Sequence, residues 1–252
     1  MSKPKQLLER YAIYAVALTI GATLWQLISY KTNPAFLSSF TKTMAQIWEF
    51  ILDGTLEAAL LSSLGLFAAG MFFAVIVGLL LGLLLARVRL LRVALENYIT
   101  ILYATPMVAL IPFILSTMGF GFAPKALVVF LFAFFPILYN TVEGARSIRP
   151  EMIEVAKSFR SSEWSLWCEV MIPYTLPYTM TGVRQSIGRA LVGMVAAEFF
   201  LSSTGLGQLI MTASQNFDTG GVFASIFVIG MAGVGLMRVG LMIEQHFAKW
   251  RQ

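Results

Sequence analysis

Six long apolar segments divide the chain, and they limit its possible folds more than any other feature of the sequence. An α-helix needs about 20 apolar residues to cross the hydrocarbon core of a bilayer, since each residue advances the helix by about 1.5 Å. Of the 252 residues, 58% are hydrophobic and only 12% are charged, a balance too apolar for an ordinary soluble domain. The sequence therefore predicts an all-α integral membrane protein with six transmembrane helices. The expected spans are about residues 11–28, 58–86, 93–118, 126–141, 178–201 and 222–243.

Lysine and arginine residues are shared unequally between the two sets of span ends. Lys31, Lys42 and Lys125 flank one set. The other set is flanked by twelve: Lys3, Lys5, Arg10, Arg87, Arg89, Arg92, Arg146, Arg149, Lys157, Arg160, Lys249 and Arg251. Because positive residues are retained on the cytoplasmic side during insertion, we expect both termini to be cytoplasmic. Topology then accounts for the net charge of +5, and we expect no nucleic-acid partner.

The first span is too long for the core of a cleaved signal peptide, so we expect it to remain as an anchor. An amphipathic stretch follows at 31–54, where Met44, Ile47 and Trp48 repeat at helical spacing and Trp48 suits the headgroup level. It predicts an interfacial helix on the outer face, with a docking surface for an external partner as the alternative. The expected parts of the chain are a cytoplasmic N-terminus at 1–10, the first span with the interfacial helix at 11–56, and a main transmembrane domain at 57–250 that includes a cytoplasmic loop at 146–177.

Small residues recur at every fourth position in the second span, at Gly70, Ala74, Gly78 and Gly82. Such a face lets two helix backbones approach closely in lipid, where packing rather than hydrophobicity drives association. We expect this helix to be central to the bundle.

Two prolines, Pro106 and Pro112, lie inside the third span. A proline frees a backbone carbonyl and kinks its helix, and broken helices at membrane depth occur where they line a cavity or are buried in protein. Tyr103, Thr105 and Pro106 are therefore candidates for part of a path through the membrane, with a kinked packing helix as the alternative. In the fourth span, Pro136 and Asn140 are candidates for a similar break.

The fifth span contains ionisable residues at Arg184, Arg189 and Glu198. Charges at membrane depth cost several kcal/mol and are rarely present without a role. Arg184 and Glu198 are 14 positions apart, about 21 Å along a helix, so each needs a separate partner or water. Arg184 and Glu198 are further candidates for the path. A helix–helix clamp or gate is the alternative, as is snorkelling for Arg184.

The loop at 146–177 predicts two short helices. The first starts at Pro150, with Glu151 in its first turn and with Met152, Val155, Ala156 and Phe159 on one apolar face. The second is capped by Ser161 or Ser162 and continues through Trp164. We expect Pro173 and Pro177 to interrupt the chain before the fifth span. The small apolar face needs either the membrane surface or another protein to cover it.

The segment from Glu154 to Arg160, followed by Pro173, resembles the cytoplasmic EAA loop of ABC importer permeases. Wider runs, at 139–146, 181–184, 188–193, 197–198, 204–207 and 216–219, look like the nitrate, sulfonate and taurine type of permease, and together they extend the resemblance over about residues 34–250. Two positions depart from the pattern. Val155 replaces an alanine, and Arg160 stands where glycine is usual, although a non-glycine residue at φ > 0 costs roughly 1 kcal/mol or more.

The resemblance implies the six-helix architecture of type I ABC importer permeases, in the bacterial cytoplasmic (inner) membrane. It implies two copies of this chain, two copies of an ABC ATPase that holds ATP and Mg, an extracytoplasmic substrate-binding protein, and surrounding lipid. The chain itself is expected to bind no cofactor or metal and to have no catalytic residues. The residues that the resemblance places in ATPase coupling are Glu151, Glu154, Val155, Ala156, Lys157, Phe159, Arg160, Trp164 and Pro173.

Other functional classes lack their motifs. No phosphate-binding loop of the Gly-x4-Gly-Lys-Ser/Thr form is present, so an ATP-driven role needs a separate motor. One cysteine, Cys168, and one histidine, His246, provide too few ligands for a structural zinc site, and no motif of an intramembrane hydrolase occurs. A secondary transporter is the main alternative, but it would be expected to show internal repeats and mid-membrane carboxylates, of which Glu198 is one candidate.

Overall fold

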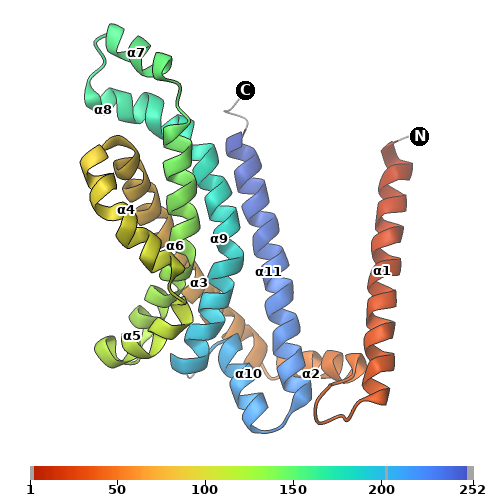
Figure 1. Ribbon diagram of the computed structural model, residues 1–252. Coiled ribbons are helices and arrows are strands. Elements are labelled where there is room, and N and C mark those ends of the chain that lie inside the picture. Colours follow the sequence, from red (N-terminus) through yellow and green to blue (C-terminus); the bar gives the residue numbers. More distant parts are fainter. Residues whose placement is uncertain (1–2, 202–203, 249–252) are drawn as a thin grey trace.

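The computed structural model describes residues 3–201 and 204–248, which fold into helices joined by short connections (Figure 1). The helices are α1 Lys3–Lys31, α2 Phe40–Leu52, α3 Thr55–Arg87, α4 Arg89–Ala104, the 3-10 helix η1 Met107–Leu110, α5 Ile111–Met118, α6 Phe122–Arg146, α7 Pro150–Ser158, α8 Glu163–Ser165, the π-helix η2 Leu166–Met171, α9 Ile172–Leu201, α10 Leu206–Gln215 and α11 Thr219–Ala248.

Helix α6 is the centre of the bundle and packs between α3 and α9. Its residues Val129, Ala133 and Ile137 are completely buried and belong to the main apolar core. Helix α7 projects beyond one end of the bundle, here called the α7 end, while α2 and α10 lie at the opposite end, called the α10 end (Figure 1). The Lys3 end of α1 and the Ala248 end of α11 both lie toward the α7 end.

Four helical segments are long and apolar enough to cross a membrane: Ala12–Lys31, Thr55–Arg87, Phe122–Arg146 and Thr219–Phe247. The pair Arg89–Ala104 and Met107–Met118 meets the same criterion jointly but is bent by 93°, so the structure has four such spans, or five if the pair is one broken span. Helix α9 has 30 residues but is not among them, because Arg184, Arg189 and Glu198 interrupt its apolar sequence.

The break expected at Pro106 is present, whereas the others are not. Helix α4 ends at Ala104, and Pro106 has no amide hydrogen with which to continue the helix. Pro112, by contrast, lies in the first turn of α5, where its missing hydrogen has no cost.

The expectation of a break at Pro136 and Asn140 was wrong, since α6 is continuous and the Asn140 side-chain amide donates to the Pro136 carbonyl at 2.7 Å. The expected interruption at Pro173 and Pro177 was also wrong. The π-helix η2 continues directly into α9, Pro173 lies in the first turn of α9, and the helix, which packs against α6, is unbroken at Pro177.

Glycines bring the three central helices together. A Cβ atom added at Gly70 would lie 2.5 Å from Val129, and one at Gly78 would lie 2.9 Å from Ile137. The same face of α3 continues through Ala74, which is fully buried, and Gly82. The opposite side of α6 approaches α9 just as closely. A Cβ at Gly182 would lie 2.8 Å from the Pro136 carbonyl oxygen, a contact that the spacing in α3 did not predict.

Helix α1 stands apart from the bundle for most of its length (Figure 1). It is held near the α10 end, where the Trp25 indole donates to the Ser38 carbonyl at 2.9 Å and packs 5.8 Å from the Phe223 ring. The helix expected within residues 31–54 is α2, which begins after Ser39, whose hydroxyl accepts from the Lys42 amide at 3.2 Å.

A Gly78→Leu substitution should disrupt the bundle more than Leu80→Ala. The new side chain would need space that Ile137 occupies, while Leu80 is exposed on the outside of α3. Thermal unfolding and size-exclusion profiles of the two variants in the same detergent measure this difference. Equal melting temperatures for Gly78→Leu and Leu80→Ala would contradict it.

Candidate functional site

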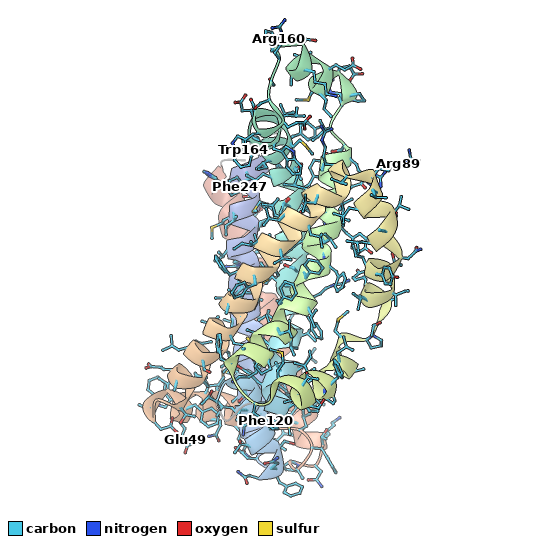
Figure 2. All side chains as sticks on the ribbon, turned by 90° about the vertical axis from the view of Figure 1, so that its left-hand side faces the viewer. Glu49, Arg89, Phe120, Arg160, Trp164 and Phe247 are labelled. Carbon is cyan, nitrogen blue, oxygen red and sulfur yellow. The ribbon has the colours of Figure 1, made fainter. Side chains whose placement is uncertain are left out.

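Large apolar side chains are exposed on α7 and on the segment that follows it. Val155 lies on the helix and is 55% exposed, while Phe159 at its C-terminal end and Trp164 in the following helix are 82% and 78% exposed. Figure 2 shows Arg160 at the tip of this projection, with Trp164 closer to the bundle. A group of exposed apolar side chains on a helix that projects from the bundle marks a surface for a partner or for the membrane interface.

The turn after α7 keeps the geometry usual for glycine although the residue is Arg160. Its φ is 56°, in the left-handed region. The Arg160 amide donates to the Lys157 carbonyl at 2.9 Å and the Ser161 amide to the Ala156 carbonyl at 3.1 Å, which is the hydrogen-bond pair of a Schellman motif. These bonds satisfy the end of α7 and offset the cost of the left-handed residue, which is roughly 1 kcal/mol.

An open groove runs between α7 and the segment that returns to the bundle. Its volume is about 590 Å³, and its walls combine Met152 and Val155 from α7 with Val170 from η2. Glu151 and Glu169 place carboxylates on its rim. The sequence predicts the apolar face of α7 that forms one wall of the groove. It does not predict that η2 forms the other wall.

Two connections fix this projecting unit to the bundle. Both oxygens of the Glu163 carboxylate accept from one guanidinium nitrogen, Nη2, of Arg87 at the end of α3, at 2.8 and 3.1 Å. The Ser162 hydroxyl accepts from the Ser165 amide at 3.1 Å and so starts the helix that continues through η2 into α9. The segment after α7 is therefore connected to both α3 and α9.

The expected coupling residues thus lie in one unit. Glu154, Lys157 and Arg160 are exposed, and Ala156 is half-buried. Pro173 is set apart from them, half-buried at the start of α9, where it begins the transmembrane helix rather than interrupting the loop.

A second candidate site lies where α4 breaks. Tyr103, Thr105 and Pro106, all singled out in the sequence, line one cavity of about 300 Å³ together with Phe132 from α6 and Arg189 from α9. The Arg189 guanidinium donates to the Tyr103 hydroxyl at 3.0 Å, and its Cζ atom lies 5.2 Å from the centre of the Tyr103 ring. The sequence identifies Arg189 as an ionisable residue inside a span, but only the structure places it beside the break after α4.

Asn140 lies nearby rather than in this cavity. Its side-chain amide donates to the side-chain oxygen Oε1 of Gln185 at 3.2 Å, which links α6 to α9. Tyr139, the residue before it, packs 5.3 Å from Tyr103.

Arg184 lies outside the cavity. Its guanidinium Nε forms an ion pair with Glu244 of α11 at 2.5 Å, and Glu244 also accepts from the Thr181 hydroxyl at 2.8 Å. Arg184 therefore joins α9 to α11. Its partner, which is 60 positions away, was not predictable from the sequence.

Glu198 also lies outside the cavity and is 1% exposed. Its two oxygens accept from the Ser63 hydroxyl at 2.6 Å and from the Gly207 amide at 2.7 Å. The Ser63 hydroxyl in turn accepts from the Leu206 amide at 2.9 Å. Glu198 thus clamps α3, α9 and α10 together. This arrangement fits the helix-clamp alternative and not a position in a path through the membrane.

Two glycines make this clamp possible. Gly205 has φ 110° and ψ 168°, a conformation essentially restricted to glycine, and a Cβ there would lie 2.2 Å from a Glu198 carboxylate oxygen. At Gly207, a Cβ would lie 2.7 Å from the Glu198 Cβ. Within residues 3–201 and 204–248, no group of three or more His, Cys, Asp or Glu side chains is placed to hold a metal ion.

The chain belongs to the family described as "Binding-protein-dependent transport system inner membrane component", whose model matches residues 74–250. It is a multi-pass membrane protein and an ABC importer permease of the sulfonate and nitrate type.

Two curated relatives illustrate the range of that family. The chain is 32% identical over 203 residues to the putative aliphatic sulfonates transport permease protein SsuC of Bacillus subtilis, covering 81% of this chain and 74% of that one. It is 33% identical over 237 residues to the riboflavin transport system permease protein RibX of Chloroflexus aurantiacus, covering 93% and 88%. A crystal structure of an amino acid ABC transporter has the same fold, with a TM-score of 0.57 and 16% identity over 82% of this chain and 96% of that chain.

A Gly205→Ala substitution should destabilise the protein by about 1–3 kcal/mol, because the backbone conformation is strained for alanine and the methyl group would meet the Glu198 carboxylate. Gly65→Ala is the matched control, since a Cβ at Gly65 meets nothing within 4 Å. Thermal unfolding in detergent compares them. If Gly205→Ala melts no lower than Gly65→Ala, the clamp does not depend on this glycine.

Proposed function

We propose that this chain is the membrane-spanning subunit of an ATP-driven importer, which receives a small solute from an external binding protein and is moved by a separate ATPase. The observation that carries the proposal is the projecting α7, an exposed amphipathic helix joined to the bundle through Arg87 and the continuous η2–α9 helix. Family membership supports it.

The proposed topology has six crossings with both termini in the cytoplasm. Helices α1, α3, α6, α9 and α11 each extend between the α7 end and the α10 end (Figure 1). The bent pair adds the sixth crossing, because Arg89 at the start of α4 and Phe120 just after α5 lie toward opposite ends of the bundle (Figure 2). The α7 end would be cytoplasmic, in agreement with the excess of Lys and Arg near it.

In the proposed coupling mechanism, α7 inserts into a groove on the ATPase, which binds ATP and Mg. Movement of the ATPase would displace α7, and the connections to α3 and α9 would transmit the displacement into the bundle. Two ATPases and a second copy of this chain would complete the transporter, in the cytoplasmic membrane of a bacterium. This chain would hold no cofactor and catalyse no reaction.

The alternative function, a secondary transporter, has less support from the structure than from the sequence. Its candidate carboxylate, Glu198, is engaged by the Ser63 hydroxyl and the Gly207 amide and is closed off from solvent. A carboxylate that couples transport to an ion gradient has to exchange partners during the cycle.

Replacing Phe159 with aspartate should abolish co-purification of the ATPase, because the ring is 82% exposed and a charge in an apolar docking groove is poorly solvated. Phe217→Asp is the control, since Phe217 is 90% exposed between α10 and α11, at the opposite end of the bundle. Affinity purification through a tag on the permease measures the amount of ATPase retained. Equal retention by both variants would count against docking at α7.

A charge reversal on α7 should weaken coupling without unfolding the chain. Glu154→Lys or Lys157→Glu alters an exposed position, so the expected effect is reduced transport per ATP hydrolysed in reconstituted complexes. Uptake and phosphate release measured in the same vesicles give the ratio. An unchanged ratio in both variants would show that these charges take no part.

A further inference from the structure

The cavity at the α4 break contains one unneutralised positive charge. Of the side chains that line it, Arg189 alone is charged. Within the described ranges 3–201 and 204–248, the arginines that form ion pairs are Arg87 and Arg184, and no carboxylate lies within ion-pairing distance of Arg189. The Tyr103 hydroxyl and ring face are its contacts there, and neither carries a compensating charge.

The depth of Arg189 in the helix distinguishes it from an arginine that reaches the membrane surface. It lies 17 residues after the start of α9 and 12 before its end, about 26 Å and 18 Å along the helix axis. A cation at such depth is expensive unless it faces water, a partner or a ligand. Arg238 on α11 is only 10 residues, about 15 Å, from the end of its helix.

Aromatic packing holds the guanidinium in place. The Tyr103 ring lies 5.4 Å from Phe135 and 5.3 Å from Tyr139, so the hydroxyl that receives the Arg189 hydrogen bond is fixed by α6. A guanidinium has five N–H donors, and this bond uses one of them. The Thr105 hydroxyl already donates its hydrogen to the Ile101 carbonyl at 2.9 Å. The charged hydrogen-bond donor of the cavity is therefore Arg189.

We propose that Arg189, positioned by Tyr103, binds the oxyanion group of the transported solute in the cavity at the α4 break. The remaining donors of the planar guanidinium match two oxygens of a carboxylate, nitrate, bicarbonate or sulfonate group, and the aromatic wall accepts a short apolar tail. The inference rests on the proposed importer function and adds the residues of this chain, Arg189 and Tyr103, that would hold the anionic group of the solute. A lipid phosphate could supply the same oxyanion chemistry, so the test separates the two sources.

The test uses the complete transporter, with its ATPase and binding protein, in vesicles of phosphatidylcholine. ATP-dependent uptake is measured for nitrate, bicarbonate, ethanesulfonate and riboflavin. Wild type should take up at least one of the three anions. Arg189→Gln should reduce that uptake at least tenfold, while Arg189→Lys, which keeps the charge without the planar fork, should raise KM more than it lowers kcat. Tyr103→Phe, which removes the hydroxyl but keeps the ring, should give a smaller rise in KM.

Arg238→Gln is the matched control, because it removes an arginine that likewise forms no ion pair among the described residues and lies on α11, and it should transport at the wild-type rate. Co-purification of the ATPase with each variant shows whether the complex has assembled. If Arg189→Gln does not assemble, the KM values of Arg189→Lys and Tyr103→Phe still test the anion site.

Several results would overturn the anion site. One is uptake by Arg189→Gln at the wild-type rate. Another is ATP-driven uptake of riboflavin alone, which would leave the importer function intact. A third is a stabilisation of wild type by added phosphatidylglycerol that Arg189→Gln loses while its transport is unchanged, because that result assigns Arg189 to lipid. Wild type that binds no ATPase and shows no ATP-dependent uptake would instead overturn the proposed function itself.

Discussion

The close contact of α6 with α3 and α9 is the interaction on which the rest of the structure depends. In a lipid environment apolar side chains gain little by leaving their surroundings, so helices associate through packing. Gly70 and Gly78 bring α3 against α6, and Gly182 brings α9 against its other side. This three-helix core fixes the positions of both candidate sites, since α3 and α9 hold the α7 unit and α6 and α9 supply two walls of the cavity.

The features that were predicted correctly from the sequence are those that short-range interactions along the chain determine. The small-residue spacing of α3, the break at Pro106 and the amphipathic α7 each arise from a few neighbouring residues. The continuity of α6 through Pro136 and of α9 through Pro177 was mispredicted, because the penalty of a proline is local, whereas the packing of α6 against α3 and α9 comes from the folded chain.

Charged residues in the bundle show the same limit. The sequence indicated that Arg184 and Glu198 need partners, but it could not indicate which ones. Arg184 pairs with Glu244 on another helix, and Glu198 bonds to Ser63, which is 135 positions away, and to a backbone amide of α10. In the sequence Arg189 looks like Arg184, an arginine inside an apolar span. The cavity beside Arg189 exists because the chain bends after α4, which the sequence does not show. The difference between a clamp and a candidate binding residue is therefore a matter of tertiary position.

The Glu198 clamp also determines where this end of the molecule can separate. One carboxyl group is hydrogen-bonded to α3 and α10 at the same time, so moving either helix away from α9 would leave a buried polar group without a partner. Among the described residues α5 makes no hydrogen bond to Glu198, but its Ile111 and Ile114 are buried in one apolar cluster with Val128 of α6 and Ala197 of α9. Apolar packing therefore holds α5 at this end, whereas hydrogen bonds to a buried carboxyl group hold α3 and α10.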